Sequence, residues 1–150
     1  CSAIAATQSR EIIESRGHKI NKINTFPIVV SDEIESVEKT KDMIKILDSL
    51  NLSQDVRRLD SRKPRTGKSA LRGRGTKIGK SVLFVVAKSE KLSKSCNGIS
   101  GIDVKLVKDL SVLDLAPGGT PIRLTVYSKS ALKEIAKIKS PHLELMVTLR

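Results

Sequence analysis

The sequence predicts an α/β fold: a single domain with a mostly parallel four-stranded sheet flanked by helices, plus a basic Gly/Arg-rich loop. This prediction rests on apolar runs of strand length and on helical patterns that separate them. The runs are residues 26–30, 82–87, 102–107 and 124–127. Three are almost continuously apolar, as strands buried on both faces of a parallel sheet are, whereas residues 102–107 alternate more and suit a position nearer the edge. Because strands and helices alternate along the chain, we expect right-handed crossovers.

The first helical pattern covers residues 2–16, and Gly17 behind it suits the left-handed conformation that ends many helices. Residues 40–50 carry the clearest amphipathic pattern, with apolar side chains spaced at i, i+3, i+4 and i+7. These side chains are Met43, Ile46, Leu47 and Leu50.

Shorter helices are expected at residues 53–59, 90–96 and 112–115. Ser128 is a typical N-cap for a last helix, in which we expect three apolar side chains to point inward. These side chains are Leu132, Ile135 and Ala136.

Length and charge limit the classes of protein that fit. The chain has 150 residues, of which 39% are apolar, enough for the core of one domain. The net charge of +12 favours a polyanionic partner such as nucleic acid or an anionic membrane surface. No apolar run approaches the roughly 18–20 residues of a membrane span, so we expect that the chain does not cross a bilayer. We expect nucleic acid, and no membrane, as the partner.

The positive charge is concentrated in residues 61–80, which carry eight of the 28 lysines and arginines, four of the nine glycines and no acidic residue. Glycines let the backbone approach phosphates closely, and arginine presents a planar fork of donors to them. Arg57 and Arg58 extend the basic stretch upstream. We therefore predict that this loop binds nucleic-acid phosphates. The candidate RNA-binding residues are Arg62, Lys63, Arg65, Gly67, Lys68, Arg72, Gly73, Arg74, Lys77 and Lys80.

Aromatic residues are scarce. Phe26, Phe84 and Tyr127 are the only three, and the chain has no tryptophan. This leaves too few rings for the base-stacking platforms of single-strand RNA modules. Recognition is therefore expected to depend on phosphates and on shape.

Two short motifs resemble nucleotide-binding loops but fail on spacing. Gly67-Lys68-Ser69 resembles the end of a P-loop, yet Arg62 stands where that motif needs its first glycine, and no apolar strand precedes it. Gly73-Arg74-Gly75 begins like a dinucleotide fingerprint, but the next glycine is Gly79, one position late, and a strand follows instead of a helix. Both motifs are better explained as parts of a phosphate-binding surface loop.

Other catalytic and metal-binding patterns are also missing from the sequence. There is no G-x-S-x-G motif, and neither His18 nor His142 has a persuasive nucleophile or orienting residue nearby in sequence. Cys1 and Cys96 do not form a zinc-binding pattern, and we expect a reduced protein with Cys96 buried. The acidic cluster of residues 32–38 is more typical of charge at a helix start than of a metal site. We predict no enzyme activity, no cofactor, no metal and no small-molecule substrate.

Several segments carry a resemblance to a known family through their order and spacing. They are residues 1–7 (CSAIAAT), 16–18 (RGH), 27–30 (PIVV), 32–35 (DEIE), 39–41 (KTK), 65–68 (RTGK), 71–74 (LRGR), 115–119 (LAPGG), 123–128 (RLTVYS) and 130–132 (SAL). Together they resemble the universal large-subunit ribosomal protein L-four family, in its archaeal/eukaryotic form. The resemblance covers about residues 1–138, which it implies are one α/β rRNA-binding domain that includes the basic loop, and it leaves residues 139–150 as a C-terminal tail.

The resemblance implies an α/β domain that binds large-subunit rRNA near the tunnel region, beside neighbouring ribosomal proteins of a cytoplasmic ribosome. It also implies that the basic loop contacts rRNA phosphates. The loop pattern of the family carries over to Arg65, Gly67, Lys68, Arg72, Gly73 and Arg74, whereas Lys77 and Lys80 are added from charge alone.

One departure from the family is large. Its members begin with a strand, a helix and a long arm that reaches the peptide tunnel, all of which precede the segment that matches Cys1. We therefore expect a fragment or a processed product, and we assign no tunnel-lining role to this chain. We also expect the sheet to lack a strand, which would leave an unpaired edge.

The leading hypothesis is thus a structural constituent of the large ribosomal subunit, without catalysis. One alternative is a regulatory RNA-binding protein that acts on mRNA outside the ribosome. Another is a nucleotide-binding enzyme on a doubly wound fold.

Overall fold

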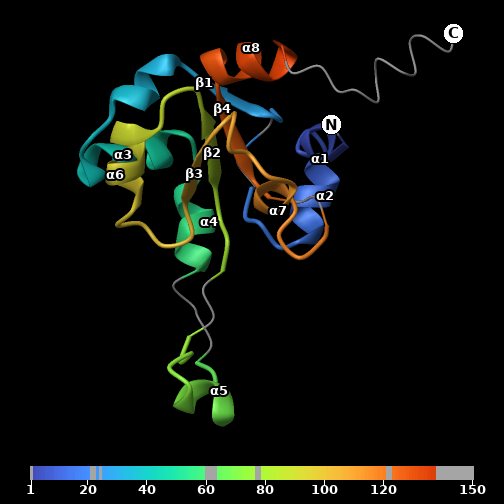
Figure 1. Ribbon diagram of the computed structural model, residues 1–150, viewed down its shortest axis with the longest axis vertical. Coiled ribbons are helices and arrows are strands. Elements are labelled where there is room, and N and C mark those ends of the chain that lie inside the picture. Colours follow the sequence, from blue (N-terminus) through green and yellow to red (C-terminus); the bar gives the residue numbers. More distant parts are fainter. Residues whose placement is uncertain are drawn as a thin grey trace, which may run out of the picture.

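The four expected strands pair into one sheet, and all three pairings are parallel. The computed structural model describes residues 2–20, 23, 25–59, 64–76, 79–120 and 123–137. The strands are β1 (Ile28–Val30), β2 (Leu83–Val86), β3 (Asp103–Leu106) and β4 (Thr125–Ser128), in the spatial order β1-β4-β2-β3. The predicted fold class, a parallel four-stranded sheet flanked by helices, is therefore confirmed (Figure 1).

The two central strands explain the continuous apolar runs. Every residue of β2 and β4 is buried, whereas every residue of the edge strand β3 is half-buried. The prediction from the alternating polar and apolar residues 102–107, a strand nearer the edge of the sheet, is thus confirmed. The other edge is β1, where the Val29 side chain is 44% exposed.

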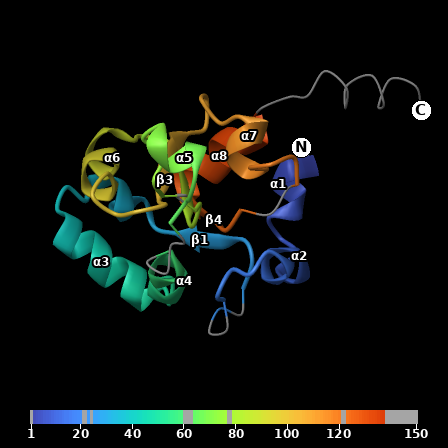
Figure 2. The ribbon, with the colours of Figure 1, turned by 90° about the horizontal axis from the view of Figure 1, so that it is seen from below.

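Helices cover both faces of the sheet. Alternate strand residues point to opposite sides, so the apolar central strands present side chains to be buried on each face. Val82, Phe84 and Val86 pack into the core under α3 (Thr40–Ser49), α4 (Ser53–Arg58) and α6 (Glu90–Cys96). Leu83 and Val85 point to the other core, under α1 (Ser2–Ala6), α7 (Val112–Leu115) and α8 (Lys129–Lys137). Figures 1 and 2 show the two helical layers on either side of the sheet.

The helix expected over residues 2–16 is wrong in one respect, because it is two helices. The chain breaks after α1 and resumes as α2 (Arg10–Ser15). At the break Thr7 is buried, and its hydroxyl donates to the carbonyl of Ile4 at 2.6 Å and lies 3.2 Å from the hydroxyl of Tyr127 on β4. A hydroxyl that bonds the backbone in this way competes with the helical ladder. Gly17 ends α2 with φ +80°, as predicted.

The remaining predicted helices are present, with one side chain misplaced. Ser128, the last residue of β4, caps α8, because its hydroxyl accepts from the amide of Ala131 at 3.1 Å. Leu132 and Ile135 pack against the core as expected, but Ala136 is exposed and Ala131 is buried instead. At about 100° per residue, Ile135 lies about 40° around the helix from Ala131, whereas Ala136 lies about 140° away.

Two features were absent from the sequence prediction or differ from it. The acidic cluster begins a 3-10 helix, η1 (Asp32–Ser36), instead of an α-helix. The basic loop contains a short helix, α5 (Lys68–Leu71), above an antiparallel bridge between Pro64 and Thr76. The amide of Arg65 donates to the carbonyl of Gly75 at 2.8 Å across this bridge.

Cys96 is buried in the core, as predicted, and burial raises the pKa of its thiol to about 11. This thiol is therefore protonated and unreactive at neutral pH.

Candidate nucleic-acid interface

The basic loop projects from the amino ends of the strands. Figure 1 shows α5 well away from the sheet, beyond the end at which β2 begins. In doubly wound sheets, ligand crevices form at the opposite, carboxyl ends of the strands. The loop therefore lies at the end of the sheet opposite to the one at which such crevices form.

The described loop residues present their charges outward. Lys68, Arg72 and Arg74 are exposed, and Arg65 is half-buried. Arg62, Lys63 and Lys77 lie outside the described residues. Within residues 64–76, the loop thus groups four of the predicted phosphate-binding side chains around α5.

Gly67 and Gly73 flank α5 with φ of +66° and +73°. A Cβ atom at either position would meet nothing within 4 Å, so space is available there. The requirement for glycine is therefore conformational, because side chains rarely adopt positive φ. These two glycines determine the path of the loop around its basic residues.

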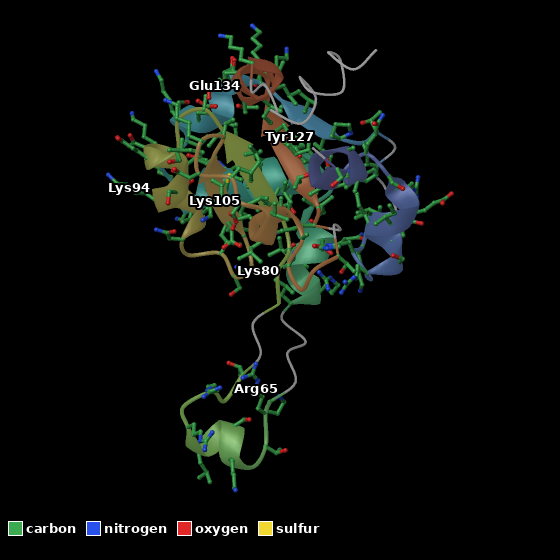
Figure 3. The ribbon with its side chains drawn as sticks, turned by 45° about the vertical axis from the view of Figure 1, so that its right-hand side comes forward. Arg65, Lys80, Lys94, Lys105, Tyr127 and Glu134 are labelled. Carbon is green, nitrogen blue, oxygen red and sulfur yellow. The ribbon has the colours of Figure 1, made fainter. Side chains whose placement is uncertain are left out.

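Lys80 does not join the loop cluster. It lies at the root of the loop on the body of the domain, far from Arg65 (Figure 3). Its ammonium group is 2.6 Å from a carboxylate oxygen of Asp103, just inside β3. This candidate therefore belongs to a second basic surface.

That second surface contains a cavity of about 140 Å³ at the amino ends of the strands, which we call the basal pocket. Its lining residues are Arg16, His18, Arg58, Lys80, Pro117, Thr120 and Arg123. Lys80 was predicted from charge, and Arg58 was recognised as part of the basic stretch. Arg16, Thr120 and Arg123 were missed, since each stands alone among uncharged or mixed neighbours and only folding brings them together.

A fully buried carboxylate, Asp55, holds one wall of this pocket. It accepts from His18 Nδ1 at 2.9 Å, from the amide of Lys19 at 3.0 Å and from Arg58 Nε at 2.9 Å. The hydroxyl of Ser81, just before β2, donates to it as well. Burial by itself raises the pKa of Asp55, but the hydrogen bond and charge of His18 and the bonds from Ser81 and Arg58 outweigh it. The pKa therefore lies well below its usual range, and Asp55 is ionised.

Arg123 holds the other wall. Its guanidinium, of which 1% is exposed, donates to the carboxylate of Asp103 and to the carbonyls of Ser81 at 3.3 Å and Val82 at 3.4 Å. Burial raises the pKa of Asp103, but its hydrogen bonds from Lys80 and Arg123 outweigh burial and lower it. These contacts tie the segments that precede β2 and β4 to the first residue of β3.

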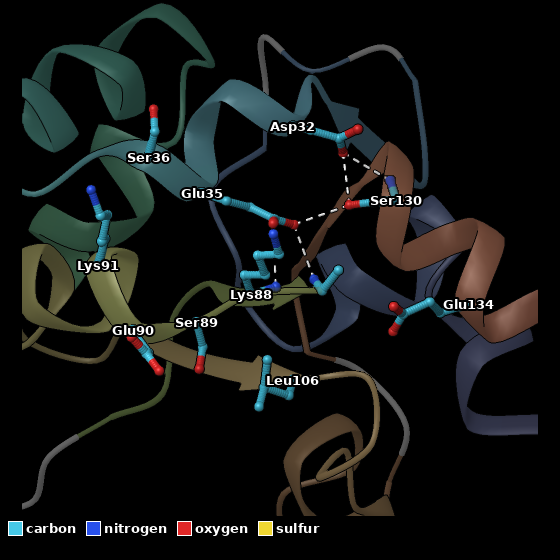
Figure 4. Close-up of a pocket in the computed structure, with 11 residues that line it drawn as sticks. Asp32, Glu35, Ser36, Lys88, Ser89, Glu90, Lys91, Leu106, Ser130 and Glu134 are labelled. Atoms are coloured by element: carbon cyan, nitrogen blue, oxygen red, sulfur yellow. Dashed lines mark hydrogen bonds between the residues drawn. The ribbon is translucent and has the colours of Figure 1, made fainter.

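The carboxyl ends of the strands carry a larger pocket of about 960 Å³, lined in part by acidic side chains. Glu35 accepts from the amides of Ala87 and Lys88 at 3.0 and 3.2 Å and from the hydroxyl of Ser128 at 2.8 Å. Asp32 accepts from the amide of Ser130 at the start of α8, at 2.8 Å (Figure 4). The amides that would meet a phosphate in a nucleotide-binding sheet are thus already satisfied by a carboxylate.

The acidic side chains of residues 32–38 thus bind different partners and do not converge on one point. Hydrogen bonds from the backbone and side chain of Ser130 lower the pKa of Asp32, and Glu38 pairs with Lys91 at 2.8 Å. Within the described residues, no group of three or more histidine, cysteine or acidic side chains is arranged to hold a metal ion. Within the same part of the chain, no helix combines the length and apolar character needed to cross a bilayer.

The profile of the ribosomal protein L4/L1 family matches residues 1–138. The chain belongs to this family. The resemblance inferred from short segments is thereby confirmed, and membership in a ribosomal protein family agrees with the expectation that the chain is not an enzyme.

Relatives within the family include archaeal proteins named large ribosomal subunit protein uL4. The one from Sulfurisphaera tokodaii is 43% identical over 138 residues, which cover 91% of this chain and 52% of the relative. The one from Halobacterium salinarum is 39% identical over 137 residues, covering 91% and 55%. The one from Haloarcula marismortui is 38% identical over 136 residues, covering 91% and 54%. The chain thus spans about half the length of these family members.

Proposed function

We propose that the chain is a structural constituent of the large ribosomal subunit that binds large-subunit rRNA through phosphate-contacting basic residues. The observation that carries this proposal is the basic loop, which projects from the amino ends of the strands with its charges outward. Residues 61–80 hold eight positive charges and no negative one, whereas the rest of the chain is nearly balanced. The names of the archaeal relatives support the same subunit.

The proposal includes the candidate residues Arg62, Lys63, Arg65, Gly67, Lys68, Arg72, Gly73, Arg74, Lys77 and Lys80. Neighbouring large-subunit ribosomal proteins are the expected protein partners, on cytoplasmic ribosomes. We further propose that residues 1–138 act as one rRNA-binding domain and residues 139–150 as a tail.

Replacing the four described loop cations with alanine tests the loop directly. RNA that binds by displacing counterions gives a binding constant that falls with salt, with a slope of about −0.7 to −0.9 per phosphate contact. Binding of an rRNA fragment by the unaltered chain is therefore expected to have a log–log slope of about −4 to −7. The variant Arg65→Ala/Lys68→Ala/Arg72→Ala/Arg74→Ala is expected to bind more weakly, with a slope whose magnitude is smaller by about 2.8 to 3.6.

A variant with the same charge loss elsewhere is the matched control. Lys94, Lys108, Lys129 and Lys133 are exposed outside the loop, so their replacement by alanine is expected to leave most of the slope intact. Both variants are expected to melt within about 2 °C of the unaltered chain, because exposed substitutions change stability little. A slope near zero, or equal losses in both variants, contradicts the proposal. Failure to co-sediment with large subunits through a high-salt wash would favour an RNA-binding role outside the ribosome.

A further inference from the structure

We propose that the basal pocket binds a phosphate group of the RNA backbone and gives the domain a second anchor at the root of the loop. This inference rests on the proposed RNA-binding function and adds a site to it. The pocket is built from segments far apart in sequence. Arg16 and His18 follow α2, Arg58 ends α4, Lys80 precedes β2, and Thr120 and Arg123 precede β4.

The charge of the lining fits an anion. Among the described residues, four lysine or arginine side chains line the pocket, and no acidic side chain does. The carboxylates of Asp55 and Asp103 contact pocket cations from outside the lining. Counting both of them, the balance of the described residues here remains positive by two charges. Phosphate oxygens are strong acceptors for the donors that arginine, lysine, threonine and histidine supply.

The donors are also held in place before any ligand binds. The Nδ1 atom of His18 donates to Asp55, because an ionised carboxylate can only accept. Only 7% of the His18 side chain is exposed, and its other ring nitrogen, Nε2, donates to a ligand in the protonated imidazolium form alone. Arg58 is oriented by the same carboxylate and donates to the carbonyl of Lys80 at 3.3 Å. Side chains fixed in this way lose little conformational entropy on binding, in contrast to the exposed cations of the loop.

The volume of the basal pocket indicates which kind of anionic ligand fits. Its volume of about 140 Å³ is well below the roughly 300–1,000 Å³ of pockets that enclose small-molecule ligands. It therefore suits one phosphate group of a chain that lies across the surface, and not an enclosed nucleotide. A neighbouring hollow lined by Lys19, Gln54, Arg57 and Arg58 continues the basic surface beside it. A polyphosphate backbone thus has a track that leads away from the pocket.

Single substitutions that avoid the buried network test the anchor. Arg16→Ala and Lys80→Ala each remove a pocket cation whose side chain is largely exposed. Each is expected to weaken binding of the rRNA fragment about three- to fivefold and to reduce the salt slope by about 0.7 to 0.9. The matched control is Arg10→Ala, which removes a cation of α2 that pairs with Glu14 at the surface. The control is expected to leave both quantities unchanged.

Titration with inorganic phosphate tests the pocket without RNA. At constant ionic strength, phosphate is expected to shift the His18 imidazole and Thr120 amide NMR signals saturably, and chloride is not. The Arg16→Ala variant is expected to lose this response, and His18→Gln identifies the imidazole signal. Absence of a phosphate-specific shift overturns the inference.

The two experiments together separate the possible failures. If phosphate binds but Arg16→Ala and Lys80→Ala leave the RNA slope unchanged, the pocket takes free phosphate and the backbone anchor is wrong. If the loop variant loses RNA binding while both pocket variants retain it fully, the anchor is wrong and the proposed function stands. If the unaltered chain does not bind rRNA, the proposed function itself fails, whatever the phosphate titration shows.

Discussion

Asp55 is buried beneath the basal pocket and holds basic side chains of its wall in place. Its carboxylate is fully buried and contacts the segment after α2, the end of α4 and the start of β2. Such a group is costly to bury unless its charge is paired and its oxygens accept hydrogen bonds. Both conditions are met here, so the basic wall of the basal pocket is anchored from behind.

Replacing this carboxylate by an amide is expected to destabilise the domain. Asp55→Asn leaves Arg58 and His18 without their anionic partner and is expected to cost about 3 kcal/mol of the free energy of unfolding in urea titrations. Asp42→Asn is the control, since Asp42 pairs with Lys45 at the surface, and its expected cost is about 0.5 kcal/mol or less. Equal stability of the two variants would show that the buried network contributes little.

The same group predicts how stability depends on pH. In the folded protein its pKa is lowered from the ordinary value of 3.8, so the unfolded chain binds the proton more readily. The stabilising contribution is therefore fully present above about pH 5 and is lost as the pH falls below about 4. The fall in unfolding free energy over this acidic range is expected to be shallower in Asp55→Asn. If the free energy of unfolding depends on acidic pH in the same way in the unaltered chain and in Asp55→Asn, Asp55 does not contribute to this dependence.

At the scale of elements, the loop shows local structure that a charge pattern does not reveal. The basic residues surround α5, which stands between two glycines of positive φ above an antiparallel bridge. A run with this charge and glycine content would by itself suggest an irregular chain. The bridge and the glycines instead define a short arm with a specific path.

Alanine at these glycines separates backbone conformation from bulk. Gly73→Ala places a side chain at φ +73°, with a penalty of about 1 kcal/mol, and is expected to weaken rRNA binding about fivefold. Gly75→Ala adds the same methyl group in open space, outside the positive-φ set, and is expected to bind normally. Filter binding of one rRNA fragment to both variants measures the difference. Equal affinities would mean that the path of the loop does not matter for binding.

At the scale of the whole molecule, the two ends of the sheet differ in charge. The loop and the basal pocket lie at the amino ends, whereas Glu35 and Asp32 satisfy backbone amides at the carboxyl ends. The position that holds nucleotides in doubly wound enzymes is thus closed to phosphate by a carboxylate. The basic groups of the loop and of the basal pocket lie on the opposite side.

This polarity predicts that nucleotides do not bind. Isothermal titration with Mg-ATP or Mg-GTP is expected to give no saturable heat, because Glu35 already occupies the amides of Ala87 and Lys88. The Gly67-Lys68-Ser69 segment lies on the projecting loop instead of behind a strand. Saturable, magnesium-dependent binding that Lys68→Ala abolishes would restore the P-loop interpretation.

Much of the fold was predictable because buried elements have characteristic patterns of apolar residues in the local sequence. The central strands β2 and β4 are apolar on both faces, and α3 buries Met43 and Leu47 at helical spacing. The position of the basic loop before β2 likewise predicts the end of the sheet from which it emerges. In contrast, the break between α1 and α2 depends on Thr7 meeting Tyr127, 120 residues later. No local pattern contains that contact.

The sequence by itself determined the strand and helix order, the family and the concentration of charge in one loop, since periodicity and composition are local properties. Only the tertiary structure decided that Lys80 pairs with Asp103 and that Arg16, His18 and Thr120 share a pocket with Arg123. These side chains are polar and widely spaced in sequence, so hydrophobic periodicity does not report them. The strands that carry or follow several of them are all parallel, so their amino ends lie together at one end of the sheet although they are distant in sequence.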